Sequence, residues 1–145
     1  MRLPPRGGRR AAALAASLLL FAASGCGSRL ANVKGTVTLA DGRPMTKGMV
    51  IFETGDGPET VMARGAIAPD GTFEMSTFRP GDGVPPGKYK VLINPLDLSD
   101  VPDEKKNLPF DVKYLKFATS GLEYEVKAGP NDFPIKLDRG HKPAR

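Results

Sequence analysis

Few side chains of this sequence are suited to chemistry, and their spacing limits which chemistry is possible. The 145 residues include one cysteine, Cys26, and one histidine, His141. A zinc site built from cysteine and histidine ligands needs about three or four such side chains, so we expect no metal site of this kind. Ser120 stands in Thr-Ser-Gly with no histidine nearby, which favours a turn serine over the nucleophile of a hydrolase. We therefore predict no catalytic residues and no enzymatic activity.

Two further segments have the composition of ligand-binding loops. Residues 81–88, Gly-Asp-Gly-Val-Pro-Pro-Gly-Lys, are the nearest match to a phosphate-binding loop, but the spacing is wrong and two prolines remove backbone donors. Residues 94–109 hold four acidic side chains whose oxygens suit calcium. Two lysines adjoin these acids and the spacing of an EF-hand is absent, so we interpret 94–109 as a long exposed loop. The four acidic residues are Asp97, Asp100, Asp103 and Glu104.

The first 25 residues have the three-part pattern of a secretory signal peptide. Four arginines and no acidic residue precede an apolar run over 11–23, and the small residues Ser24 and Gly25 stand before Cys26. The apolar run is shorter than the roughly 20 residues of a membrane-spanning helix and matches the core of a signal peptide. Without these arginines the chain has 17 basic and 16 acidic residues, so its basic character belongs to the leader. We therefore expect no nucleic-acid partner.

The junction Ala23-Ser24-Gly25-Cys26 resembles the lipobox of bacterial lipoproteins. This resemblance implies cleavage between Gly25 and Cys26, a diacylglyceryl thioether on Cys26 and no other cofactor. Residues 26–32 would then be the lipidated cysteine and a tether that holds the chain on a membrane. Gly27 favours the outer membrane, because no aspartate follows the cysteine. The alternative is a plain signal peptide followed by an unmodified cysteine.

From residue 33 onward apolar and polar residues alternate with a period of two, with interruptions rich in Gly, Pro and Asp. This pattern is typical of an all-β chain, and no helical period occurs outside the leader. We expect a two-sheet sandwich over 33–138, built from short antiparallel strands, and a disordered tail over 139–145. The seven expected strands are approximately 33–39, 49–54, 61–68, 72–77, 88–94, 122–127 and 133–138.

Two pairs of neighbouring strands are predicted to form hairpins. Asp70 and Gly71 separate residues 61–68 from 72–77, and an Asp-Gly pair accepts the positive φ angles of tight turns. Residues 128–131, Ala-Gly-Pro-Asn, separate the last two strands in the same way. Between the long loop and residue 122, three aromatic residues suggest a segment that covers the sandwich, with an exposed sugar- or peptide-binding strip as the alternative. These are Phe110, Tyr114 and Phe117.

Four segments share features with one family of β domains: Gly35-Thr-Val-Thr-Leu-Ala-Asp-Gly-Arg-Pro44, Val50-Ile-Phe52, residues 65–73, and Pro86-Gly-Lys-Tyr-Lys-Val91. Together they resemble the carboxypeptidase regulatory-like domain. The resemblance implies a seven-stranded antiparallel Greek-key β-sandwich of the transthyretin-like (prealbumin-like) type, acting as an accessory module and not as a catalyst.

The sequence therefore predicts a non-enzymatic lipoprotein of the bacterial cell envelope, attached through Cys26. Its β-sandwich would present an interaction surface, on the periplasmic or outer face, to an envelope protein or glycan. Unpaired edge strands are a further way to bind a partner chain. The alternatives are a carbohydrate- or calcium-binding envelope protein and, third, a hydrolase without recognisable motifs.

Overall fold

The computed structural model describes residues 29–54, 59–95 and 108–140. The leader with Gly25 and Cys26, most of the 94–109 loop and the end of the tail with His141 lie outside these ranges. The described chain forms seven strands and two single-turn helices. They are β1 (Val33–Thr38), β2 (Met49–Thr54), β3 (Met62–Ala66), β4 (Thr72–Glu74), β5 (Gly87–Asn94), η2 (Val112–Leu115), α1 (Phe117–Ser120), β6 (Leu122–Val126) and β7 (Asn131–Lys136).

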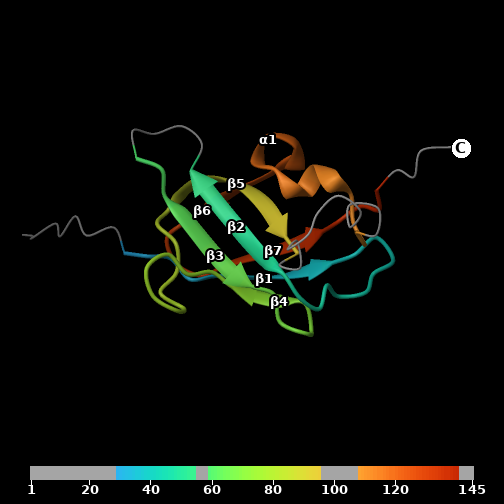
Figure 1. Cartoon of the computed structure of the whole chain (residues 1–145). Helices are drawn as coiled ribbons and strands as arrows, with labels where there is room; N and C mark the ends of the chain where they lie inside the picture. Colours follow the sequence, from blue (N-terminus) through green and yellow to red (C-terminus); the bar gives the residue numbers. More distant parts are fainter. Residues whose placement is uncertain (1–28, 55–58, 96–107, 141–145) are drawn as a thin grey trace, which may run out of the picture.

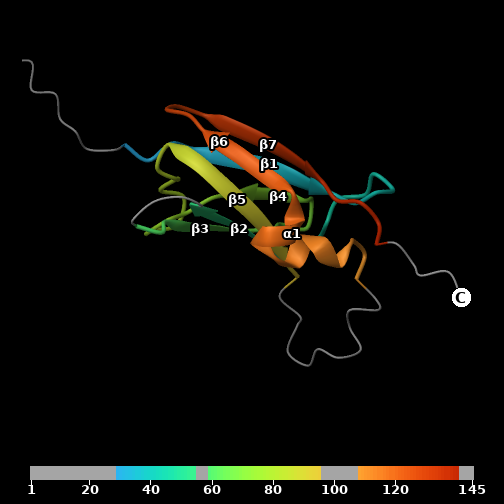
Figure 2. The ribbon, with the colours of Figure 1, turned by 90° about the horizontal axis from the view of Figure 1, so that it is seen from above.

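The strands form two sheets around one hydrophobic core (Figures 1 and 2). One sheet has three strands in the order β4-β1-β7, and the other has four in the order β3-β2-β5-β6. This architecture is consistent with the predicted all-β sandwich. All seven predicted strands are present, although β4 is shorter than expected, and the two short helices were not predicted.

Alternation of side chains decides which face of each strand is buried. On β1, Val33 and Val37 are buried while Lys34 and Thr36 are exposed. On β2, Phe52 is fully buried opposite Val91 of β5, as the pattern predicts. Burial of such apolar side chains is the main favourable contribution to folding, at about 25 cal/mol per Å².

The expectation that all strands are antiparallel is wrong for β1 and β7, which run parallel from Val33 opposite Asn131 to Thr38 opposite Lys136. The closing hairpin is also wrong, because β6 pairs with β5 in the other sheet. The Asn131 side chain redirects the chain between the sheets: it accepts from the Lys127 N–H and donates to the carbonyls of Lys127, Gly129 and Asn32. After this turn β7 starts beside the start of β1, so the two run in the same direction.

The turn of the predicted hairpin over 61–77 is confirmed, but its two strands belong to different sheets. Gly71 has a φ of 85°, and Asp70 accepts hydrogen bonds from the backbone and hydroxyl of Thr72 at 3.0 and 2.6 Å. Arg64 and Ser76 also exchange backbone hydrogen bonds of 2.8 Å. Between these points the two arms separate, since β3 pairs with β2 while β4 pairs with β1. The hairpin therefore links the two sheets.

The segment between the long loop and β6 covers one side of the core (Figure 2). Phe110 and Tyr114 are buried and their rings meet edge to face at 6.3 Å. Their burial confirms the predicted covering segment and excludes these two rings from an exposed binding strip. The Tyr114 hydroxyl donates to Asp138 at 2.8 Å, and the Lys113 ammonium lies 3.1 Å from the same carboxylate.

Candidate functional site

The residues singled out from the sequence fall into two groups. Ser120 is only 4% exposed, and its hydroxyl accepts from the Leu122 N–H at 3.2 Å, which confirms a structural turn serine. Residues 81–86 form a loop in which Val84 is buried. The lipidation and cleavage residues, the four acids proposed for calcium and the single histidine lie outside the described residues: Gly25, Cys26, Asp97, Asp100, Asp103, Glu104 and His141.

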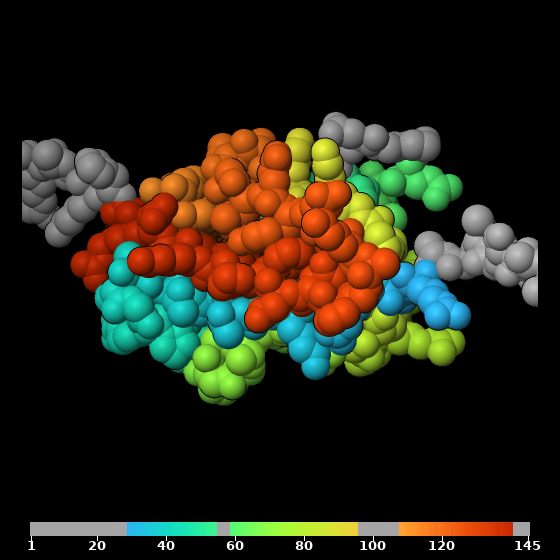
Figure 3. All heavy atoms as spheres, turned by 180° about the vertical axis from the view of Figure 1, so that it is seen from behind, coloured from blue at the N-terminus to red at the C-terminus, as the bar shows by residue number. Residues whose placement is uncertain are grey.

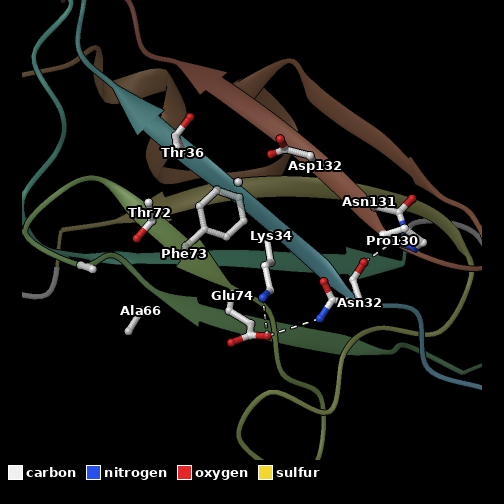
Figure 4. A pocket seen from close by; sticks show the side chains of 12 residues that line it. Asn32, Lys34, Thr36, Ala66, Thr72, Phe73, Glu74, Pro130, Asn131 and Asp132 are labelled. Atoms are coloured by element: carbon white, nitrogen blue, oxygen red, sulfur yellow. Dashed lines mark hydrogen bonds and ion pairs between the residues drawn. The ribbon is translucent and has the colours of Figure 1, made fainter.

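A groove of about 680 Å³ crosses the outer face of the β4-β1-β7 sheet. We call it the polar groove after the charged and hydrogen-bonding side chains along it (Figure 4), although apolar atoms make up most of its exposed lining. These side chains point outward because they alternate with core residues along each strand. The groove is lined by Asn32, Lys34, Gly35, Thr36, Ala66, Ala68, Thr72, Phe73, Glu74, Pro130, Asn131 and Asp132.

Charged groups at one end of the polar groove hold one another in place. The Lys34 ammonium lies 3.6 Å from Glu74 Oε1, and the Asn32 amide donates to the same oxygen at 3.3 Å (Figure 4). The Lys34 and Glu74 side chains are both about half-exposed. An ion pair exposed in this way contributes little to the stability of the fold, so both charged groups are accessible to a ligand. A polar ligand would find a cation, a carboxylate and an amide within one extended surface.

The strands under the polar groove pack closely because β1 has a glycine at its centre. Gly35 pairs with Phe73 in the sheet, and a Cβ added at Gly35 would lie 2.6 Å from Phe73 Cζ. The same Cβ would overlap the carbonyl oxygen of Phe133. The absence of a side chain at Gly35 thus lets the three strands pack closely below the groove.

A second surface feature is the loop of residues 76–83, called the Phe78 loop. The side chain of Phe78 is 80% exposed, more than any other large apolar side chain of the described chain. The loop around it is tightly hydrogen-bonded: Gly81 N–H donates to the Ser76 hydroxyl, and the Thr77 hydroxyl donates to the carbonyl of Gly83. Phe78 is therefore displayed on a fixed backbone and does not lie on a flexible tip.

Asp82 organises this loop by accepting three backbone N–H groups. The donors are Thr77 at 2.8 Å, Phe78 at 2.9 Å and Arg79 at 2.8 Å. Burial by itself would raise the pKa of the Asp82 carboxyl, but the three N–H donors outweigh it and hold the pKa below its usual value. The carboxylate is therefore charged at neutral pH and keeps the loop closed.

The Phe78 loop lies at the end of the molecule where the described chain starts. Ala31 donates to the Val84 carbonyl at 2.7 Å and accepts from the Val84 N–H at 2.9 Å. Figure 3 shows the yellow-green residues of the loop next to the blue residues that begin the described chain. The end of the Phe78 loop is therefore fixed beside Ala31.

Within the described ranges, no three or more His, Cys, Asp or Glu side chains are placed to hold a metal ion. No buried side-chain nitrogen or oxygen in the same ranges is left without a hydrogen-bond partner. None of the helices there is long and apolar enough to span a membrane.

The chain has no match among protein-family models, curated proteins or solved structures. Its function must accordingly be inferred from its own residues, above all from the polar groove and the Phe78 loop.

Sequence reasoning missed both surfaces. The polar groove combines strands that are far apart in the chain, and nothing local in the sequence places β7 beside β1. The Phe78 loop had a local signal in Phe-Arg-Pro-Gly-Asp-Gly, because an aspartate between glycines commonly accepts backbone N–H groups of its own loop.

Proposed function

We propose that this chain is a membrane-anchored, non-enzymatic lipoprotein of the bacterial cell envelope. A diacylglyceryl group on Cys26 holds it on the membrane, with the outer membrane favoured, and Gly25-Cys26 is the cleavage site. The polar groove is the surface that contacts another envelope macromolecule, a protein or a glycan.

The polar groove is the observation that carries this proposal. It displays a cation, two carboxylates and several hydroxyl and amide groups across three rigid strands. Side chains held on strands lose little freedom when a ligand binds, which favours recognition. The titratable side chains of the groove are Lys34, Glu74 and Asp132.

We also propose that the sandwich is the Greek-key type of the carboxypeptidase regulatory-like domain. After the β2-β3 pair in the four-stranded sheet, the chain returns to place β4 beside β1. The return of a fourth strand to lie beside the first is one feature of a Greek key, here with β1 and β2 in different sheets. In that family the domain is an accessory module, which agrees with a binding role for the groove.

In-cell photocrosslinking tests the contact surface. A photoreactive residue replaces Thr36, an exposed residue of the polar groove, and a control carries it at Glu123, an exposed residue of β6. We expect one reproducible crosslinked product from position 36 and none from position 123. Mass spectrometry then distinguishes a protein from a glycan.

Two variants make the assay specific. Lys34→Ala removes a groove cation and should reduce crosslinking, while Lys88→Ala removes an exposed cation of β5 outside the groove and should not. Cys26→Ser should abolish the product, because the chain leaves its membrane. Equal crosslinking from positions 36 and 123 would contradict the groove as the contact surface.

A further inference from the structure

The polar groove leaves the Phe78 loop unexplained, although this loop displays the most exposed aromatic side chain of the described chain. A large apolar ring exposed on an ordered loop is available to bury its surface against a partner. The Asp82 hydrogen bonds hold the backbone from which this ring projects.

The covalent chain limits the distance between the proposed lipid and this loop. Cys26 precedes Ala31 by five residues, and an extended chain covers at most about 3.3–3.6 Å per residue, so the two are within about 18 Å. Ala31 is itself fixed to Val84 by two backbone hydrogen bonds. A bilayer that holds the Cys26 lipid is therefore within reach of the end of the sandwich that bears Phe78.

The residues at this end suit the surface of a bilayer. Phe78 is followed by two exposed residues, Arg79 and Pro80. Two more exposed cations lie at this end: Arg29 before the start of β1, and Lys127 in the turn between β6 and β7. Aromatic side chains settle at the boundary between headgroups and acyl chains, while arginine and lysine are attracted to lipid phosphates. Asp82 does not oppose this attraction strongly, because its carboxylate is turned toward three backbone N–H groups.

We infer that the Phe78 loop is a second membrane contact, which inserts Phe78 into the headgroup region of the phospholipid bilayer that holds the Cys26 lipid. This inference rests on the lipid anchor of the proposed function. One ring and a few cations bind a bilayer weakly by themselves, but the anchor makes this second contact intramolecular and raises its effective concentration. Two contacts would fix the orientation of the sandwich relative to the bilayer.

Tryptophan fluorescence provides a direct test because the chain contains no tryptophan. Phe78→Trp introduces one fluorophore into the loop. Val112→Trp is the matched control, because Val112 is 49% exposed but lies far from the Phe78 loop. Val112 begins η2, which lies next to Asp138, beyond the end of β1 opposite to the Phe78 loop. The lipidated full-length variants are reconstituted into vesicles of phosphatidylethanolamine and phosphatidylglycerol, with or without bromine on the acyl chains.

We expect the Phe78→Trp emission to shift to the blue on reconstitution and to lose most of its intensity in brominated vesicles, while the Val112→Trp emission stays unchanged. If Phe78→Trp behaves like the control although the protein sediments with the vesicles, the second contact is overturned and the anchor stands. If neither variant carries lipid or sediments with the vesicles, the anchor itself fails and this inference fails with it.

Discussion

The backbone of Gly83 lies directly against Ala31, so that a Cβ at position 83 would overlap the Ala31 carbonyl oxygen and lie 2.9 Å from its carbonyl carbon. This contact holds the Phe78 loop against the segment that leads back to Cys26. The contact therefore connects the two features required by the inferred second membrane contact, which are the tether and the exposed ring of Phe78.

Substitution of Gly83 should separate the cost of a side chain at a positive φ angle from the cost of a clash with Ala31. Gly83 has a φ of 95° and Gly42 a φ of 84°, yet a Cβ at Gly42 would meet nothing within 4 Å. Both alanine variants incur about 1–2 kcal/mol for a side chain in the left-handed region. We expect Gly83→Ala to lower the free energy of unfolding by a further ~1–3 kcal/mol, because the tether must move. Denaturant unfolding of both variants measures the difference, and equal losses would contradict the close contact.

Removal of the Asp82 carboxylate should open the Phe78 loop and leave the sheets intact. In Asp82→Ala the amides of Thr77, Phe78 and Arg79 lose their acceptor, so we expect their hydrogen exchange to accelerate while that of Phe52 in β2 is unchanged. Asp132→Ala, which removes an exposed carboxylate of β7, is the control. Unchanged exchange of these three amides in Asp82→Ala would show that the carboxylate does not organise the loop.

The stability of the Phe78 loop should depend on pH through the Asp82 carboxylate. Although burial opposes ionisation of Asp82, its N–H partners hold the folded pKa below the ordinary aspartate value of about 3.9. The stabilising contribution is therefore fully present above about pH 4 and is lost as the pH falls through the lower folded pKa. Protection of the Phe78 amide should persist at pH 4 and decline in more acidic solution. Loss of protection well above pH 4 would contradict the lowered pKa.

Phe52 and Phe78 should respond in opposite ways to truncation, because one ring is fully buried and the other is 80% exposed. Phe52→Ala removes a core ring and should lower the free energy of unfolding by about 3–5 kcal/mol. Phe78→Ala should change it by no more than about 0.5 kcal/mol. Thermal and denaturant unfolding measure both, and a large loss in Phe78→Ala would mean that this ring supports the fold instead of being displayed.

Tyr114→Phe should weaken the attachment of the covering segment in a pH-dependent way. The Tyr114 hydroxyl and then the Lys113 ammonium lower the pKa of Asp138, so their contribution is present above about pH 4 and declines as the pH falls through the folded pKa. We expect Tyr114→Phe to melt below the unsubstituted protein at pH 7, with a smaller difference in acid. A difference that does not vary with pH would contradict the carboxylate contact.

Alternation along the chain was sufficient to predict the strands but not their partners. Val33 and Val37 on β1, and Val50 and Phe52 on β2, are buried as the period of two requires. Sheet membership was not predictable, because a turn that crosses between sheets has the same Asp-Gly or Gly-Pro-Asn chemistry as a hairpin. The turn before Asn131 shows this, since the one hydrogen bond that ties it to β1 is donated to Asn32, which precedes that distant strand.

The candidate sites were predictable to different degrees. The lipobox-like junction ending at Cys26 is a local motif, so it is visible in the sequence, although it lies outside the described residues. The polar groove is a product of tertiary structure: Lys34, Glu74 and Asp132 come from three strands whose order no local pattern encodes. A surface of this kind appears only when the pairing of β1 with β4 and β7 is known.

The most direct test of the central claim is the mass of the peptide that begins at residue 26, measured on protein purified from bacterial membranes. A lipoprotein predicts a chain that starts at Cys26, with cleavage after Gly25 and a diacylglyceryl thioether on the sulfur, and a Cys26→Ser variant without lipid. An unmodified Cys26, or a chain cleaved elsewhere, would contradict the lipid anchor and the membrane location inferred from it.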